Sequence, residues 1–304
     1  GAAPALPMGY TGAREVRARM LGLLLGDGYL PTSGSVTITS ADTGLMSALK
    51  KEAAAYGVDV RERVRNRKSG MPSYEYALVT DEDREKASSY RNHMKIWLDS
   101  LGLLGRLASE KHIPSQVFTW DKQSVEEFVH GLFEADGCAK SNGARSKLPC
   151  IVFSFTSYAL VEQLRTLLAV RLGIYSTAIE RRPVESMSSS QSHGYTITPK
   201  QDAYVIRISN RTAVQRFTEV VGGFYGSKTK KLCALMDSCP PAARDDGMVF
   251  GYLGSEPRGL RHVYDLHVDH PDHLFVLENG MIVANSDVQF ATADAGYFGK
   301  QLTN

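Results

Sequence analysis

The stretch LGLLLGDGY, residues 21–29, places two glycines inside an apolar helical run and ends that run with a carboxylate. A second stretch, HGLFEADGC at residues 130–138, repeats the arrangement. Glycine costs roughly 1 kcal/mol inside a helix, so its presence here indicates that another backbone comes close. Small residues four apart share one helix face: Gly22 and Gly26 in the first stretch, Gly131 and Ala135 in the second. We therefore expect two helices packed along these small faces.

The two stretches end in Asp27 and Asp136, which such packing would bring together. A carboxylate is unfavourable at a helix C-terminus, because that end is already negative, and two carboxylates there are worse. A divalent cation would reverse the effect, and ligands that are all oxygen suit Mg²⁺. The alternative is two ordinary amphipathic helices, each closed by a common Asp-Gly turn. Because the phrase recurs at matching positions, we favour the Mg²⁺ site.

The order of predicted elements also repeats. The first unit comprises a helix at 15–26, a strand at 35–40, a helix at 43–56 capped by Asp42, strands at 58–67 and 74–80, and a helix at 89–101. The second comprises a helix at 124–135, a strand at 150–157, a helix at 158–172, strands at 175–182 and 203–209, and a helix at 211–221. This duplication predicts an α/β (α+β) fold with pseudo-twofold symmetry.

Composition limits the class of protein more loosely. The 304 residues, 43% of them hydrophobic, suffice for one large domain or two ordinary ones. No apolar run approaches the roughly 20 residues of a membrane span, and we expect no secretory signal. Four cysteines without a CxxC pair predict buried or incidental thiols in a reducing, cytoplasmic location. A net charge of +2 neither requires nor excludes a nucleic-acid partner.

The distribution of arginine is more informative than the net charge. The stretch VDVRERVRNRKSG places Arg61, Arg63, Arg65 and Arg67 at period two. On a strand these side chains would line one face of the sheet, and a two-stranded ribbon fits the DNA major groove, where guanidinium groups read guanine. A solvated edge strand with protective charges is the alternative. The second unit offers a weaker basic set, Arg181, Arg182 and Arg207.

These paired stretches and the repeated unit order resemble the LAGLIDADG homing endonucleases. The resemblance covers residues 14–238, as repeats of about 14–121 and 122–238. It implies that Asp27 and Asp136 bind Mg²⁺ and activate water for site-specific cleavage of double-stranded DNA. It also implies a catalytic lysine near the end of each unit, for which we select Lys111 and Lys228, with Lys230 and Lys231 as alternatives to the latter. A DNA-binding fold without cleavage, acting as a scaffold or regulator, is the other hypothesis.

The segment after residue 238 carries a different chemistry. An asparagine amide nitrogen can attack its own backbone carbonyl and cut the chain after itself, and a following serine can accept an acyl group. The stretch VYDLHVDHPDHLFVLENGMIVANS resembles the last two signature blocks of inteins. The resemblance implies β-strands of a Hint-type splicing domain at 239–285 and a C-extein at 286–304. It assigns polarisation of the scissile amide to His273, assistance to Asp265, cyclisation to Asn285 and the acyl acceptor to Ser286.

Two departures from the intein pattern affect the prediction. Ala284 stands where most inteins have histidine, and Gly1 is not a splicing nucleophile. The resemblance therefore implies that splicing needs an N-terminal intein fragment, as in a split intein, and a host extein protein, with residues 1–13 as the end of a linker. His262, His267, His270 and His273 leave two alternatives open for this segment, a zinc cluster or ordinary surface histidines.

Overall fold

The computed structural model describes most of the chain. It covers residues 12–66, 72–81, 92–141, 148–192, 195–221 and 226–239, with shorter pieces at 256–257, 259–260, 262, 267–269, 273–277 and 282–284. The chain divides into two compact units, Gly1–Gly247 and Met248–Asn304. The first unit contains the duplicated helices and sheets, and the second contains a short hairpin.

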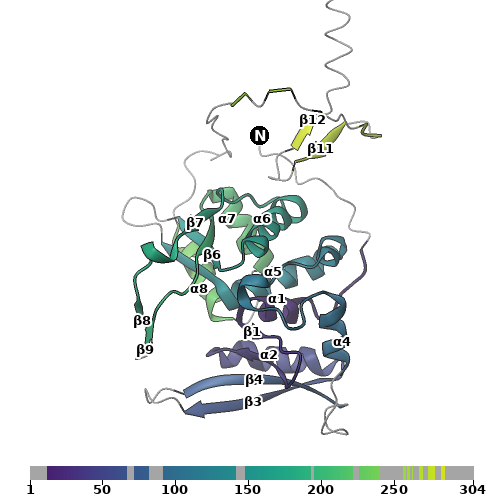
Figure 1. Ribbon diagram of the computed structural model, residues 1–304, viewed down its shortest axis with the longest axis vertical. Helices are drawn as coiled ribbons and strands as arrows, with labels where there is room; N and C mark the ends of the chain where they lie inside the picture. Colours follow the sequence, from purple (N-terminus) through teal and green to yellow (C-terminus); the bar gives the residue numbers. More distant parts are fainter. Residues whose placement is uncertain are drawn as a thin grey trace, which may run out of the picture. The chain divides into compact units, whose positions relative to one another are not determined.

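The first half of the larger unit is a four-stranded antiparallel sheet with helices on one side (Figure 1). Its strands are β1 (Gly28–Tyr29), β2 (Val36–Thr39), β3 (Val58–Asn66) and β4 (Pro72–Thr80). Its helices are α1 (Ala18–Asp27), α2 (Thr43–Ala54) and α4 (His93–Ser100), followed by short 3₁₀ turns η1 (Ala108–Glu110) and η2 (Ser115–Thr119). The strand order is β1-β2-β4-β3, so β3 lies at an edge.

The second half repeats this topology. Its principal strands are β5 (Gly137–Ser141), β6 (Pro149–Phe155), β7 (Glu180–Arg182) and β10 (Ala203–Ile208), in the order β5-β6-β10-β7. Its helices are α5 (Lys122–Asp136), α6 (Tyr158–Leu172), α7 (Arg211–Val221) and α8 (Ser227–Asp237). An added turn η3 (Val184–Ser186) and hairpin of β8 (Ser190–Ser192) and β9 (Tyr195–Ile197) interrupt the repeat. The predicted duplication is confirmed, because both four-stranded sheets share one order.

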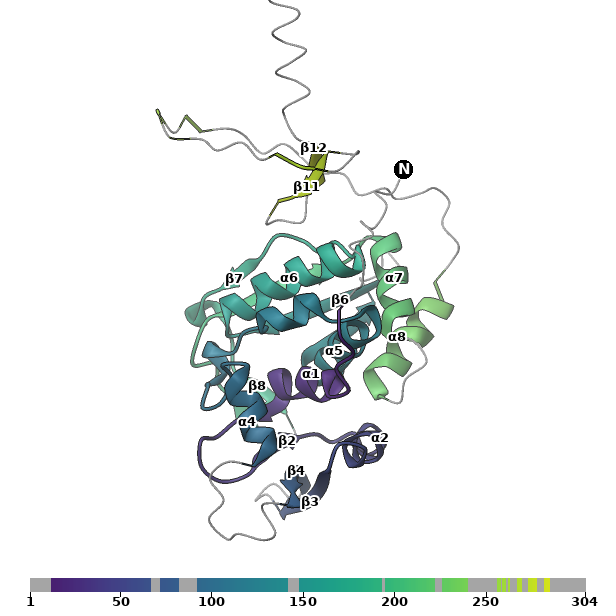
Figure 2. The same cartoon turned by 90° about the vertical axis from the view of Figure 1, so that its right-hand side faces the viewer.

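Helices α1 and α5 pack against each other at the centre of this unit, as Figure 2 shows. A Cβ atom on Gly22 would lie 2.2 Å from the carbonyl oxygen of Phe128, and one on Gly131 would lie 2.1 Å from that of Arg19. A Cβ on Gly26 would lie 2.3 Å from the Cβ of Ala135. The two backbones therefore touch along the small residues, as the sequence predicted.

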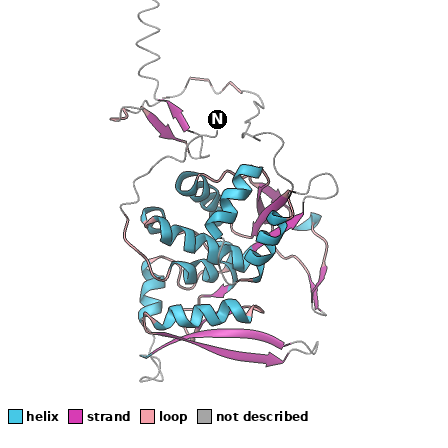
Figure 3. Cartoon of the chain, turned by 180° about the vertical axis from the view of Figure 1, so that it is seen from behind, coloured by secondary structure: helices cyan, strands magenta, loops and turns pink. Residues whose placement is uncertain are grey.

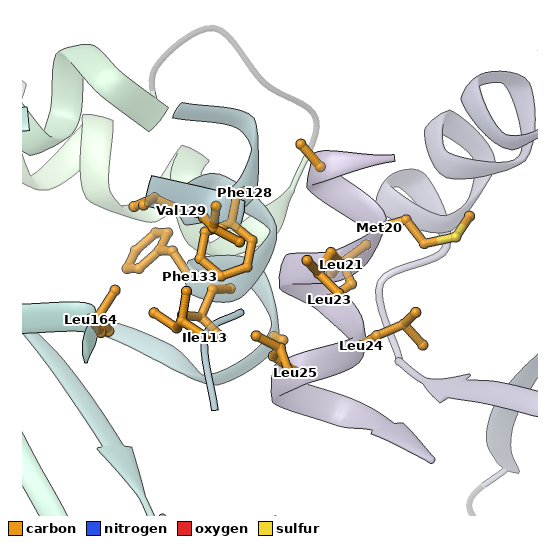
Figure 4. Packing of buried hydrophobic residues seen from close by; sticks show 14 of the residues in the cluster. Met20, Leu21, Leu23, Leu24, Leu25, Ile113, Phe128, Val129, Phe133 and Leu164 are labelled. Atoms are coloured by element: carbon orange, nitrogen blue, oxygen red, sulfur yellow. The ribbon is translucent and has the colours of Figure 1, made fainter. Parts of the chain in front are cut away.

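Apolar side chains surround this helix pair. In Figure 4, Leu21 and Leu25 of α1 lie on the side of Phe128 and Phe133, whereas Leu24 points away from α5. The sheet faces that meet the helices are apolar as well, and in the first half they carry Val36, Ile38, Val58, Val60, Tyr76 and Leu78, all buried. Figure 3 shows the helices gathered together, with the long β3–β4 pair along one margin. One continuous core results.

The second half differs from the sequence prediction in several places, among them β5 and the β8–β9 hairpin, which were not predicted. Of the strand expected at 175–182, only Glu180–Arg182 pairs regularly with β10. Before them, Thr177 contacts Arg207 of β10 through two hydrogen bonds: its amide donates to the carbonyl of Arg207 at 2.8 Å, and its hydroxyl accepts from the amide of Arg207 at 3.1 Å. Helix α8 was not predicted, because it begins with the polar run SKTKK and buries only Thr229 and Leu232.

The smaller unit contains an antiparallel pair, β11 (Leu274–Val276) and β12 (Ile282–Ala284). Within the described part of the chain, no helix has the length and apolar character that would let it cross a membrane.

Candidate functional site

Asp27 and Asp136 are the last residues of α1 and α5. The carboxylate of Asp136 lies against the last turn of α1, since a Cβ built on Gly26 would be 3.4 Å from its Oδ2 atom. Each helix is followed directly by the first strand of its sheet, β1 or β5. The packing of the two helices thus brings together two acids that lie 109 residues apart in the sequence.

The two carboxyl groups influence each other electrostatically. Burial of the carboxyl group and the negative charge of Asp136 raise the pKa of Asp27 to about 6, although the residue as a whole still presents surface to solvent. Burial likewise raises the pKa of Asp136. Lys228 and Lys111 oppose both shifts. The helix ends therefore concentrate negative charge that only partly finds compensation within the protein.

Lys111 lies under the C-terminal turn of α1. Its ammonium donates to the carbonyl oxygens of Leu24 at 2.8 Å, Leu25 at 3.0 Å, Gly26 at 3.3 Å and Gly28 at 2.8 Å, and the residue is only 4% exposed. Burial lowers the pKa of Lys111 to about 8, while Asp136 and Asp27 act to raise it. The lysine selected from the sequence therefore lies beside the first acid.

Lys228 has the corresponding position beside α5. Its ammonium donates to the carbonyl oxygen of Ala135, the residue before Asp136. The buried carboxylate of Glu134 accepts from the backbone amides of Thr229 at 2.8 Å and Lys228 at 3.3 Å. A Cβ on Gly226 would lie 1.9 Å from the carboxyl carbon of Glu134, so a side chain at this position would displace that carboxylate from the amides it binds. Lys230 and Lys231, the alternatives, are exposed.

Glu134 is a functional residue that was not predicted from the sequence. One feature of the sequence could have pointed to it. Glu134 is an acid in an otherwise apolar stretch, two residues before Asp136, and the equivalent residue of the first half is Leu25. What the sequence could not supply is the partner, because the amide of Thr229 lies 95 residues along the chain.

The acids at the helix ends suit a hard divalent cation. Both side chains offer oxygen only, which Mg²⁺ prefers, and their mutual repulsion, expressed in the raised pKa of Asp27, would be relieved by positive charge between them. Among the described residues, no group of three or more His, Cys, Asp or Glu side chains could hold a metal ion. Backbone carbonyls, water and phosphate all offer further oxygen ligands of the kind that Mg²⁺ prefers.

The basic residues of the first sheet lie on its edge strand β3. Arg61 and Arg63 are exposed, and Arg61 forms an ion pair of 3.2 Å with Asp59 two residues earlier. Both pair in register with β4, at Ala77 and Glu75. The backbone of Arg65 continues β3, and Arg67 lies outside the described residues.

The basic residues of the second sheet are paired with acids. Arg181 contacts Asp202 at 2.7 Å, and Arg182 contacts Glu180 at 2.8 Å. Arg207 also binds Glu180. Asp202 and Glu180 thus pair with all three arginines, and their two negative charges lower the net positive charge of this region.

His273 is the one predicted splicing residue that the structure describes. It directly precedes β11, has a left-handed backbone with φ of +47°, and its Nδ1 atom is buried without a hydrogen-bond partner among the described residues. The neighbouring pair in the hairpin is Leu274 with Ala284. The remaining predicted residues lie outside the described part of the chain: Asp265, Asn285 and Ser286. Of the other histidines, His262 and His267 are exposed.

Comparison with known proteins bears on this arrangement. The sequence profile of the LAGLIDADG-like domain matches residues 124–222. The chain is 24% identical over 224 residues to the replicative DNA helicase DnaB of Rhodothermus marinus, covering 73% of this chain and 22% of the helicase. It is 22% identical over 279 residues to the ribonucleoside-diphosphate reductase NrdEB subunit alpha of Bacillus subtilis, covering 88% and 24%. The chain thus spans less than a quarter of either relative.

Among solved structures, the chain is similar to the homing endonuclease I-DmoI in complex with DNA and Ca, with a TM-score of 0.45 and 14% identity, over 73% of this chain and 97% of that one. The profile match covers α5, the sheet of the second half and α7, and it includes the HGLFEADGC stretch. The match to the LAGLIDADG-like domain therefore lies in the second half of the larger unit.

Proposed function

We propose that residues 14–238 are a divalent-metal-dependent endonuclease that cuts both strands of DNA at a specific site. The observation that carries this proposal is the apposition of Asp27 and Asp136 at the C-terminal ends of two packed helices. One lysine beside each helix end, Lys111 or Lys228, completes two similar sets of groups. If these acids and lysines only stabilised the fold through ion pairs, there would be no reason for two carboxylates to lie close together, since their charges repel.

In this proposal Asp27 and Asp136 hold Mg²⁺, which would polarise the scissile phosphate and lower the pKa of an attacking water. Lys111, with a pKa of about 8, keeps its proton at neutral pH. Its positive charge, and that of Lys228, would stabilise the negative charge that develops on the phosphate during cleavage. The exposed arginines of β3 would position the duplex through its phosphates and base edges.

Cleavage can be tested with the full chain and a supercoiled plasmid library that carries a randomised insert. We expect linear products with Mg²⁺ and none with EDTA, and the cut ends should share one sequence. Asp27→Asn should slow cutting on the order of a hundredfold or more, since a group that stabilises charge in the reaction is lost, while DNA binding persists. Asp121→Asn is the matched control, because Asp121 caps the far end of α5 through the amide of Ser124.

Two results would contradict the proposal. Cutting that is unaffected by Asp27→Asn would show that the metal assignment is wrong. Specific binding without any cutting by the unaltered chain would favour the alternative function, a DNA-binding scaffold or regulator.

We further propose that the segment from residue 239 onward is the C-terminal part of an intein, followed by a C-extein from Ser286. Support comes from the comparisons, because one segment is shared with parts of a helicase and of a reductase, two enzymes with no reaction in common. An element inserted into unrelated host proteins would produce this pattern. The identity of the host, and an N-terminal intein fragment as partner, belong to this proposal as well.

The chemistry proposed for the junction is cyclisation of Asn285. Its side-chain nitrogen attacks its own backbone carbonyl carbon, the peptide bond to Ser286 breaks, and the departing amine takes a proton, which leaves a succinimide. Among the residues that the structure describes, the buried Nδ1 atom of His273 has no hydrogen-bond partner, and its backbone is left-handed, which in a residue other than glycine is typical of functional positions. Asp265 would assist acyl transfer, and Ser286 would accept the acyl group during splicing.

Release of the peptide 286–304 can be followed by mass spectrometry, with the N-terminal splicing segment of an intein supplied in trans. Asn285→Ala should abolish release and His273→Ala should slow it, whereas Ala284→His should accelerate it by adding a hydrogen-bond donor next to the scissile bond. If Asn285→Ala still releases an intact peptide, cyclisation is not the reaction.

A further inference from the structure

Asp42 makes two separate contacts with its two carboxylate oxygens. It is the N-cap of α2, where Oδ1 accepts from the amide of Leu45 at 2.9 Å. Its Oδ2 accepts from the amide of Ser227 at 2.6 Å, 185 residues along the chain. Ser227 directly precedes Lys228 at the start of α8. An N-cap of the first half therefore holds the segment that carries the lysine of the second half.

Ser157 makes the corresponding contacts from the second half to the first half. It is the N-cap of α6, and its Oγ accepts from the amide of Leu160 at 3.1 Å. The same hydroxyl donates to the carbonyl oxygen of Lys111 at 2.6 Å. Ser157 is 1% exposed, so water does not compete for this bond. An N-cap of the second half therefore holds the lysine of the first half.

These two contacts are related by the pseudo-twofold symmetry of the fold. Helix α2 follows β2, and α6 follows β6, the equivalent strand of the second sheet. We propose that Asp42 and Ser157 are positioning residues, each of which sets the lysine of the opposite half beside its aspartate. This inference rests on the proposed endonuclease function, and it adds that each half controls the chemistry of the other.

The start of α8 shows why Asp42 affects position more than folding. Three consecutive backbone amides there bind carboxylates, with Ser227 bound to Asp42 and with Lys228 and Thr229 bound to Glu134. Glu134 remains in place when Asp42 is altered, so α8 keeps its cap. Loss of the contact with Asp42 frees only the residue next to Lys228, whose ammonium must still reach the carbonyl of Ala135.

The substitution Asp42→Asn removes one contact and keeps the other. Asparagine caps helices as well as aspartate does, so its oxygen can still accept from Leu45. Its NH₂ group then faces the amide of Ser227, two donors that cannot bond. Ser157→Ala similarly removes the bond to the carbonyl of Lys111, but it also removes the side-chain cap of α6.

The experiment measures the two DNA strands separately. A duplex recovered from the randomised library is labelled with a different fluorophore on each strand, and the full chain is used in excess with Mg²⁺. Lys228→Met and Lys111→Met first identify which strand depends on which lysine, since a pseudo-twofold protein presents one half to each strand of a duplex. Asp42→Asn should then slow cleavage of the strand identified by K228M on the order of tenfold, because the reaction rate falls steeply when a reacting group is misplaced. Ser157→Ala should slow the strand identified by K111M.

A residue that only stabilises the fold would slow both strands alike, so the ratio of the two rates is the decisive measurement. Asp121→Asn, the same substitution at an N-cap without a lysine contact, should leave that ratio unchanged. Equal slowing of both strands by D42N, or selective slowing of the strand assigned to Lys111, would overturn the inference and leave the proposed endonuclease intact. Failure of the unaltered chain to cut any duplex would overturn the endonuclease and this inference together.

Discussion

Lys111 shows how one residue serves both the fold and the proposed chemistry. The last carbonyls of a helix have no partner within the helix, and α1 has no basic residue in its own last turn. The ammonium of Lys111 binds four carbonyl oxygens at this end, where positive charge is favourable. The same placement sets it beside Asp27, so replacing this lysine will lower stability as well as any catalytic rate.

His130 gives a prediction of pH dependence. Burial lowers the pKa of its imidazole below 6.5, and the neighbouring carboxylate of Glu134 opposes that shift. Well above pH 6.5 the ring is neutral in the folded and unfolded states, and its contribution to stability is fully present. Below pH 6.5 the unfolded chain binds a proton that the folded chain does not, so the free energy of unfolding falls. Between pH 7 and pH 5 this loss amounts to at most about 2 kcal/mol.

The measurement is urea unfolding at pH 5 and pH 7 for the unaltered chain and for His130→Gln, which cannot titrate. The variant should lose less stability on acidification. Asp27, whose pKa is raised to about 6, contributes the opposite slope, because its stabilising effect is lost as pH rises from 3.8. That contribution is common to both proteins, so it cancels in the difference. Equal losses in the two proteins would show that His130 does not titrate differently on folding.

At the scale of elements, the contact between α1 and α5 depends on the absence of side chains. A Cβ at position 22 would lie 2.2 Å from the carbonyl oxygen of Phe128 and 2.6 Å from the amide nitrogen of Leu132, both backbone atoms. We expect Gly22→Ala to lower the free energy of unfolding by about 1–3 kcal/mol or more through overpacking, although alanine is the better helix former. Urea unfolding measures the change.

Gly44→Ala is the matched control, because Gly44 is exposed in the first turn of α2. There the same substitution should leave stability unchanged or raise it by up to roughly 1 kcal/mol. A G22A protein as stable as G44A would contradict backbone-to-backbone packing of the two helices.

The contacts that could be predicted from the sequence are those that follow from the spacing of residues within a segment or from a repeated order of segments. Small residues four apart predicted the helix pair, and the repeated element order predicted two equivalent sheets. The sequence did not predict α8, whose short apolar face follows a basic run, or the bonds of Asp42 and Glu134 to the start of that helix. Asp42 was recognisable as a cap, but its second partner lies 185 residues away, and nothing local specifies it.

At the scale of the molecule, the two basic sheets are unequal. Arg181 of the second sheet is held by Asp202, and Arg182 and Arg207 share Glu180. The side chains of Arg61 and Arg63 in the first sheet are exposed on an edge strand, and the one ion pair described for them joins Arg61 to its strand neighbour Asp59. Because an arginine already bound to a carboxylate must break that pair to bind a phosphate, the first sheet should supply more of the electrostatic affinity for DNA.

Salt dependence of DNA binding tests this inequality. The logarithm of the binding constant falls with the logarithm of salt concentration, by about 0.9 for each phosphate that the protein neutralises. Arg63→Ala should reduce that slope by about 1, whereas Arg61→Ala and Arg181→Ala should change it less because Asp59 and Asp202 already neutralise those guanidinium groups. Lys122→Ala is the control, since Lys122 is exposed at the other end of α5, roughly 20 Å from Asp136. If the two β3 variants alter the slope no more than K122A does, this strand does not contact DNA, and the exposed arginines of β3 act only as charges that protect a sheet edge.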